Sequence, residues 1–176
     1  NGYGHGLEAI AGVLLATAKQ VAQSVNSLEG CAIAALSEAQ RLRECGWDRP
    51  IVLLPGFIDT AELDECKRLG IDPVIHSPYQ LALMLANPNG ISRVWLKANT
   101  GMNRLGLNTE AWHEALTALS AVPNLAVVAM SHLACADELD SPVTLKQKSQ
   151  FDSLLADTSA IRKTLAASGG ILAWPQ

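Results

Sequence analysis

The sequence has 176 residues, which fits one ordinary domain or a piece of a larger one. Hydrophobic residues make up 49% of it and charged residues 17%, so a sizeable core can be buried and intrinsic disorder is disfavoured. The net charge of −4 argues against nucleic acid or an anionic membrane as a partner, and no apolar run reaches the roughly 18 residues that a membrane span needs.

The four cysteines are far apart in the sequence, and no His/Cys cluster has the spacing of a zinc site. This pattern is typical of reduced, mostly buried thiols in a cytoplasmic protein and predicts no bound metal. The sequence starts within the glycine-rich stretch 1–6 and stops directly after an apolar segment. We therefore expect it to be an internal piece of a longer gene product.

An Ala-rich segment at 7–25 is predicted to be a helix, and short apolar strands then alternate with helices along the rest of the chain. The predicted strands are 31–36, 50–55, 72–77, 93–98, 125–132 and 161–168. The predicted helices between them are 38–45, 61–69, 79–86, 110–121 and 145–158. The residues expected to cap the N-termini of the first four of these helices are Ser37, Asp59 or Thr60, Ser77 and Thr109.

This alternation predicts an α/β fold with parallel strands, and the uninterrupted apolar strands indicate that both faces of the sheet are covered. Two architectures fit the pattern, an open doubly wound sheet and a closed (β/α)8 barrel. Six strands favour the open sheet by number alone. The first helix, however, implies a strand before residue 1, and one more strand beyond the other end would complete a barrel.

Polar residues collect at the carboxyl ends of the predicted strands, where both architectures place their chemistry. Lys97 ends the fourth strand, and Arg104 follows it across a glycine turn. His132 ends the fifth strand. Ser168 ends the sixth, where two following glycines would let backbone N–H groups approach an anion. Taken singly, each of these features also fits an ordinary strand end or turn.

Four segments, in this order, resemble the bacterial alanine racemases, a family that uses pyridoxal phosphate. Residues 1–6 (NGYGHG) resemble the signature KANAYGHG without its first two residues. Residues 97–106 (KANTGMNRLG) resemble K-x-[DN]-T-G-M-x-R-L-G, with Asn99 where many members have Asp. Residues 131–137 (SHLACAD) and 166–175 resemble the segments after two later strands, so the likeness covers the whole chain.

The resemblance implies a (β/α)8 TIM-type barrel, with six of its eight strands visible because both ends are truncated. Residues 1–176 would be part of the cofactor-binding barrel domain, and a C-terminal β-domain would lie outside this chain. The whole protein would be a cytoplasmic homodimer that interconverts L- and D-alanine, either to supply D-alanine for peptidoglycan or in alanine catabolism. The lysine that bonds to the cofactor would precede Asn1 and the catalytic tyrosine would follow Gln176, so the chain alone is expected to be inactive.

The resemblance also assigns roles to five residues of this chain. Tyr3 and Ser168 would bind the phosphate of pyridoxal 5′-phosphate, and His132 would lie beside the pyridine ring. Arg104 would bind the phenolic oxygen of the cofactor and a carbamate on Lys97, a lysine that many members carry in carbamylated form. The alternatives are a racemase of broader specificity, a related barrel decarboxylase and a non-catalytic cofactor-binding barrel.

Overall fold

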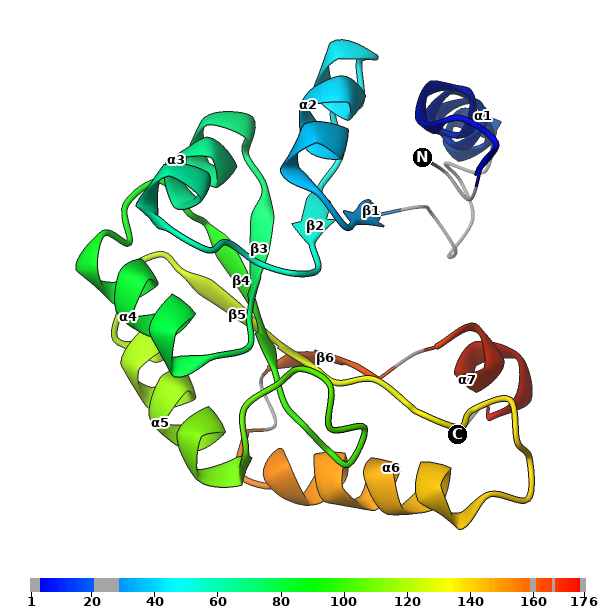
Figure 1. Cartoon of the computed structure of the whole chain (residues 1–176), viewed down its shortest axis with the longest axis vertical. Helices are drawn as coiled ribbons and strands as arrows, with labels where there is room; N and C mark the ends of the chain where they lie inside the picture. The colour runs from blue at the N-terminus through cyan, green and yellow to red at the C-terminus, as the bar shows by residue number, and fades with distance from the viewer. Residues whose placement is uncertain (1–3, 21–28, 159–160, 166, 175–176) are drawn as a thin grey trace. The chain divides into compact units, whose positions relative to one another are not determined.

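The computed structural model of the chain describes residues 4–20, 29–158, 161–165 and 167–174. Helices and strands alternate along it (Figure 1). The strands are β1 (Cys31–Ile33), β2 (Ile51–Leu53), β3 (Asp72–Ile75), β4 (Arg93–Lys97), β5 (Ala126–Met130) and β6 (Arg162–Thr164). The helices are α1 (Leu7–Gln20), α2 (Leu36–Glu44), α3 (Thr60–Leu69), α4 (Pro78–Ala86), α5 (Thr109–Ser120), α6 (Pro142–Leu154) and α7 (Ser168–Ala173). The chain divides into two compact units, Asn1–Pro73 and Val74–Gln176.

All the strand pairs are parallel, and the strands pair in the order β1-β2-β3-β4-β5-β6. The six parallel strands predicted from the sequence are therefore confirmed. A doubly wound sheet reverses its strand order at a switch point, whereas a barrel adds each strand beside the previous one. The unbroken order favours the barrel of the two architectures.

Local side-chain chemistry explains where two of the helices begin. Asp59 caps α3, because its Oδ1 accepts a hydrogen bond from the Glu62 N–H at 2.8 Å. Ser77 caps α4, with its hydroxyl 3.3 Å from the Gln80 nitrogen. Gly70 ends α3 in the left-handed conformation, with φ of 60°. The predicted cap at Ser77 is confirmed, and of the two candidates Asp59 and Thr60 the structure uses Asp59.

Two predicted caps are wrong by one or two positions. The N-cap of α2 is Ala35 rather than Ser37, and the Glu38 carboxylate instead reaches back to accept from the Ala34 N–H at 3.1 Å. The N-cap of α5 is Asn108 rather than Thr109, and its Oδ1 accepts from the Ala111 N–H at 2.9 Å. Asparagine is the stronger capping residue of the two neighbours in α5.

The bounds of α6 and β6 also differ from the predictions, and one further prediction is tested only in part. Helix α6 covers Pro142–Leu154 rather than the predicted 145–158. Its earlier start is explained by Pro142, because proline suits the first turn of a helix. Strand β6 covers only Arg162–Thr164, and the end of the predicted strand is the start of α7. Positions 21–25 of the first predicted helix lie outside the described residues.

In the second unit, β4 presents different chemistry on its two faces. Val94 and Leu96 are fully buried on one face, where the indole N–H of Trp112 in α5 donates to the Leu96 carbonyl at 3.3 Å. Trp95 and Lys97 alternate with them on the other face.

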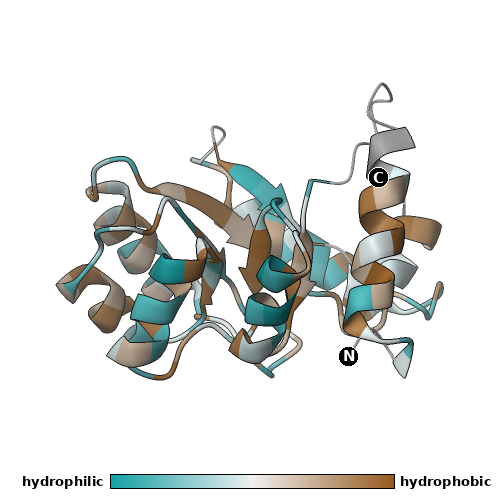
Figure 2. Ribbon diagram, turned by 90° about the horizontal axis from the view of Figure 1, so that it is seen from above, coloured by the Kyte–Doolittle hydropathy of each residue, from teal (hydrophilic) through white to brown (hydrophobic). Residues whose placement is uncertain are grey.

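Helices carry both hydrophilic and hydrophobic residues, as expected when one helix face is buried (Figure 2). No helix within the described ranges is long and apolar enough to cross a membrane.

Candidate functional site

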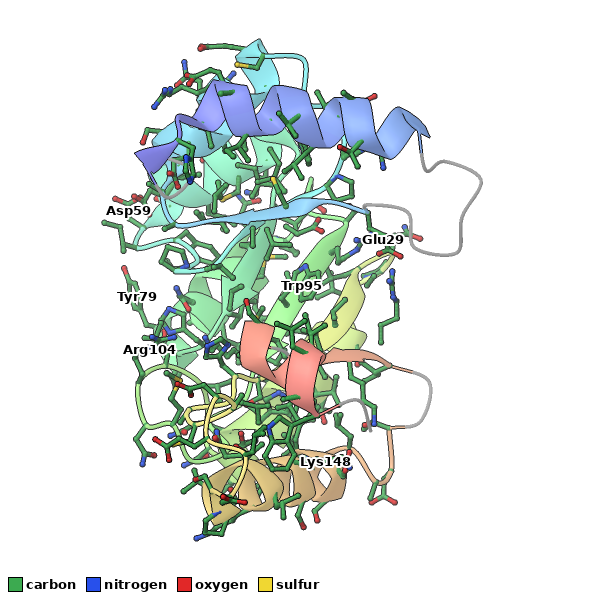
Figure 3. All side chains as sticks on the ribbon, turned by 90° about the vertical axis from the view of Figure 1, so that its right-hand side faces the viewer. Glu29, Asp59, Tyr79, Trp95, Arg104 and Lys148 are labelled. Carbon is green, nitrogen blue, oxygen red and sulfur yellow. The ribbon has the colours of Figure 1, made fainter. Side chains whose placement is uncertain are left out.

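Three of the residues singled out in the sequence lie around one small depression in the second unit. Lys97, Arg104 and His132 all line it, and the other lining residues are Ala98, Asn99, Thr100, Met102, Leu105 and Ser131. They meet because β4 and β5 run in parallel, with Lys97 opposite Met130, so the segments that follow both strands leave the same edge of the sheet. Figure 3 shows Trp95 on β4 and Arg104 on the loop beyond the end of that strand.

The loop that carries Arg104 is folded around the side chain of Asn99. Asn99 Oδ1 accepts hydrogen bonds from the backbone N–H groups of Gly101 (3.1 Å) and Asn103 (3.0 Å), and its Nδ2 donates to Asn103 Oδ1 at 3.0 Å. Asn103 is in the left-handed conformation, with φ of 57°. An aspartate at position 99 could accept the same two backbone bonds, so the asparagine in this chain preserves the turn.

The loop closes back onto the end of β4. The Leu107 N–H donates to the Lys97 carbonyl and the Asn99 N–H donates to the Leu107 carbonyl, both at 2.9 Å. Gly106 has φ of 127°, and a Cβ at this position would collide with the backbone of residues 98–99. Arg104 is thus an exposed side chain on a closed, hydrogen-bonded loop whose base is anchored at Lys97.

The wall of this depression carries positive charge without a matching anion. Lys97 is only 8% exposed, and burial together with the nearby Arg104 cation lowers the pKa of its ammonium group. Neither side chain forms an ion pair or hydrogen bond within the part of the chain that the structure describes. Trp95 lies on the same strand face as Lys97, and its buried Nε1 also lacks an acceptor among the described residues. Trp95 does not line the depression itself, so the cations of Lys97 and Arg104 are the groups there that suit an anionic ligand.

The lowered pKa predicts that Lys97 destabilises the protein in the absence of a ligand. The unfolded chain binds the Lys97 proton more tightly than the folded chain does. The loss of unfolding free energy caused by Lys97 is therefore complete below the pKa of Lys97 in the folded chain, and it fades as the pH rises towards 10.5. We expect Lys97→Met to raise the unfolding free energy of the ligand-free protein at pH 7 by about 1 kcal/mol.

Urea unfolding at several pH values measures this effect, and Lys146→Met on the exposed side of α6 is the matched control, expected to change little. The stabilisation by Lys97→Met should shrink as the pH approaches 10.5. A Lys97→Met protein less stable than the original at pH 7 would show that burial of this amine is already compensated.

Ser168 lies on a different element from these three residues and does not line the same depression. It is the first residue of α7 and is exposed, and Ala167 before it provides no side-chain cap. A Cβ on Gly169 would lie 3.0 Å from backbone atoms of Ala136 and Asp137. The small size of Gly169 thus lets α7 pack against the loop that follows His132.

The indole of Trp174 holds the other end of α7 to the same loop, because its N–H donates to the Ala136 carbonyl at 3.0 Å. Ser168 is therefore attached to the segment after His132, with Gly169 and Trp174 as the contacts. Tyr3, the remaining predicted site residue, lies outside the described residues.

The first unit contains a larger cavity, of about 490 Å³, between α1, β1 and α2. Its lining is mostly apolar, with Leu7, Ile33 and Trp47 among the contributors, and His5 and Glu38 are its two ionisable groups apart from Cys31. Burial raises the pKa of the Cys31 thiol to about 11, so this thiol stays protonated at neutral pH. The described residues that line this cavity include no cluster of polar groups comparable to that around Lys97.

A family described as "Alanine racemase, N-terminal domain" matches residues 1–176. Among curated relatives, the alanine racemase of Vibrio parahaemolyticus is 41% identical over 179 residues, covering all of this chain and 47% of the relative. The alanine racemase of Alcanivorax borkumensis is 38% identical over 176 residues, covering all of this chain and 46% of the relative. The chain thus spans about half the length of these relatives.

Solved structures agree with this comparison. The alanine racemase of Acinetobacter baumannii superposes with a TM-score of 0.87 and 28% identity, over 99% of this chain and 49% of that one. The biosynthetic alanine racemase of Pseudomonas aeruginosa superposes with a TM-score of 0.77 and 31% identity, over 90% of this chain and 45% of that one. Together with the family match, these superpositions show that the fold is an α/β TIM-barrel fragment, as the sequence predicted.

Proposed function

Because this chain belongs to the alanine racemase N-terminal domain family, we propose that the whole protein interconverts L-alanine and D-alanine with bound pyridoxal 5′-phosphate. The observation that supports this most is the family match over all 176 residues. The proposal includes a barrel domain to which residues 1–176 contribute, and a cytoplasmic homodimer in which a second, β-rich domain completes each site.

The residues around the depression fit this cofactor. Pyridoxal phosphate carries a phosphate and a phenolic oxygen, both of which accept hydrogen bonds from cations. The Arg104 cation at the wall would meet such groups, and the proposal places it against the phenolic oxygen. His132 would lie beside the ring, while the hydroxyls of Ser168 and Tyr3 would donate to the phosphate.

The cofactor supplies an electron-accepting ring that makes the Cα–H of a bound amino acid acidic enough to be removed. In the proposal, the residues of this chain hold the ring and set its charge. Arg104 would hold a cation at the phenolic oxygen, and its planar guanidinium would help to orient the ring. The two proton-transfer groups, a lysine and a tyrosine, are assigned by resemblance to positions before residue 1 and after residue 176.

Lys97 has a separate role in the proposal, as the support of Arg104. The lowered pKa of Lys97 increases the fraction of neutral amine, which is the form that can add to carbon dioxide. The addition forms an N–C bond and releases a proton, which leaves an anionic carbamate. Such a group would convert repulsion between Lys97 and Arg104 into a charge-assisted hydrogen bond.

A chimeric enzyme tests the proposed function. The 176 residues replace the matched segment of the Vibrio parahaemolyticus alanine racemase, to which they are 41% identical. We expect the chimera to racemise alanine, to bind pyridoxal phosphate and to restore growth of a bacterial host that requires D-alanine. The 176-residue chain alone is the matched control and is expected to show no racemisation.

Three further measurements on the chimera test the remaining parts of the proposal. A panel of other amino acids checks the substrate preference, sedimentation checks the homodimer, and mass spectrometry checks for a carbamate on Lys97. A folded chimera that binds the cofactor but does not racemise alanine would contradict the proposed activity. Racemisation by the isolated chain would contradict the assignment of both proton-transfer groups to positions outside it.

A further inference from the structure

One glutamine on the buried face of α6 is hydrogen-bonded to both loops of the candidate site. Gln147 is 1% exposed, and both its amide oxygen and its amide nitrogen are hydrogen-bonded. Its Oε1 accepts from the Ala134 N–H at 2.8 Å, and its Nε2 donates to the His132 carbonyl at 2.9 Å and to Thr100 Oγ1 at 3.4 Å. Burying an amide is unfavourable unless its donors and acceptors are satisfied, and here they are.

The third of these bonds begins a directed chain of buried hydroxyls. Ser131 Oγ donates to the Ala98 carbonyl at 2.9 Å, so its only proton is used there. Thr100 Oγ1, 2.8 Å away, must then be the donor to Ser131 Oγ. Thr100 therefore accepts from Gln147, and the chain runs from Gln147 through Thr100 and Ser131 to Ala98.

This chain of bonds links the two segments that carry the candidate residues. Thr100 lies between Lys97 and Arg104 on the first loop, while Ser131 and the carbonyl of His132 belong to the second. Helix α6 runs beneath the loop after β4 (Figure 1), where a Cβ on Gly101 would lie 3.5 Å from Gln147 Cγ. Gln147 itself does not line the depression, although Thr100, Ser131 and His132 do.

Gln147 also has support from within its own helix. Thr144, one turn earlier and 2% exposed, donates through Oγ1 to the Cys135 carbonyl at 3.0 Å. The second loop is thus held at His132, Ala134 and Cys135 by α6, whereas the described bonds from α6 to the first loop run through Gln147 alone. Removal of the Gln147 amide would leave the two loops without this shared bridge.

We propose that Gln147 is a positioning residue that fixes the loop carrying Arg104 relative to His132, so that both meet the cofactor in one geometry. This inference rests on the proposed function. A misplacement of about 1 Å at a site of this kind can cost on the order of 100-fold in rate, so a residue that does not touch the cofactor can still control its binding.

The test uses the cofactor-bound chimera and three variants. Gln147→Met keeps the volume and removes every hydrogen bond of the amide. Gln150→Met is the matched control, because Gln150 is an exposed glutamine on the same helix. We expect Gln147→Met to weaken pyridoxal phosphate binding by on the order of tenfold or more, and Gln150→Met to change it by less than about twofold. Hydrogen exchange at Ala134 should rise only in Gln147→Met.

Gln147→Glu separates the effect of lost hydrogen bonds from the effect of altered packing. It also provides a test of the proposal if Gln147→Met does not fold. The introduced carboxyl can donate and accept when protonated, but only accepts when ionised. Its cofactor affinity, divided by that of the unsubstituted chimera at the same pH, should therefore fall as the pH rises. Because burial raises the pKa of a carboxyl group, this fall in affinity should occur at a pH above the usual pKa range of carboxyl groups.

The outcomes distinguish this inference from the proposed function. If the unsubstituted chimera racemises alanine but Gln147→Met binds the cofactor as well as Gln150→Met does, the inference is wrong and the function stands. A Gln147→Glu affinity ratio that is independent of pH also contradicts it. If the chimera binds pyridoxal phosphate without racemising alanine, the affinity ratios still decide the role of Gln147. A chimera that folds without binding the cofactor overturns both.

Discussion

Gly106→Ala is expected to disrupt the loop that carries Arg104 and to abolish cofactor binding by the whole protein. An alanine Cβ at this position would lie 2.6 Å from the Asn99 nitrogen and 2.7 Å from the Ala98 carbonyl carbon. Both are backbone atoms held by hydrogen bonds of the strand end, so they cannot move aside at low cost. With φ of 127° the residue also adopts a backbone conformation that only glycine tolerates.

Clash and backbone strain together should cost about 3 kcal/mol or more of unfolding free energy. Gly46→Ala is the matched control, because Gly46 has φ of 82° but no atom lies within 4 Å of the position that an alanine Cβ would take there. Strain alone should then cost about 1 kcal/mol. Urea unfolding and cofactor titration of both chimeric variants check the prediction. Equal losses in the two variants would show that the close approach of Gly106 to residues 98–99 is unimportant.

Sequence patterns predicted the existence and order of the strands because most of the strands are apolar, and β2 and β3 are buried at every position. The apolar runs at β4 and β5 left little choice of register, and the order of strands followed from the regular alternation with helices. The errors arose where neighbouring residues compete for one role. Asn108 and Thr109 can both cap a helix, and α5 uses Asn108, the stronger capping residue of the two.

The candidate site was predictable only as far as its motif residues. Lys97, Arg104 and His132 stand at strand ends that parallel pairing brings together. The burial of Lys97 was not predictable, because it depends on how the loop folds back through Leu107. Arrangement in three dimensions, rather than local sequence, sets this part of the site.

Gln147 was missed because its partners are distant in sequence: Thr100 is 47 residues away. A signal did exist in the helical pattern. Thr144, Gln147, Phe151 and Leu154 recur at helical spacing on the buried face of α6, and two of the four are polar. Polar residues on a buried helix face need partners, and the nearest polar segments are the loops of the candidate site.

Arg104→Lys is expected to lower kcat/KM of the chimera for alanine by on the order of 100-fold, even though the positive charge is kept. The proposed role needs a planar group with several donors in fixed directions, whereas a lysine ammonium is a flexible point charge. Arg104→Met removes the charge as well and should be at least as inactive. Arg68→Lys is the matched control, since Arg68 is 59% exposed and pairs with Glu65 on the surface.

The pKa of Lys97 separates charge from geometry in these variants. The Arg104 cation helps to lower this pKa, so Arg104→Met should raise it, while Arg104→Lys should leave it lowered. NMR titration of lysine side chains in the cofactor-free chimera measures both. Loss of activity in Arg104→Lys with an unchanged Lys97 pKa would show that the directed donors of Arg104 matter beyond its charge. Full activity in Arg104→Lys would instead reduce Arg104 to a source of positive potential.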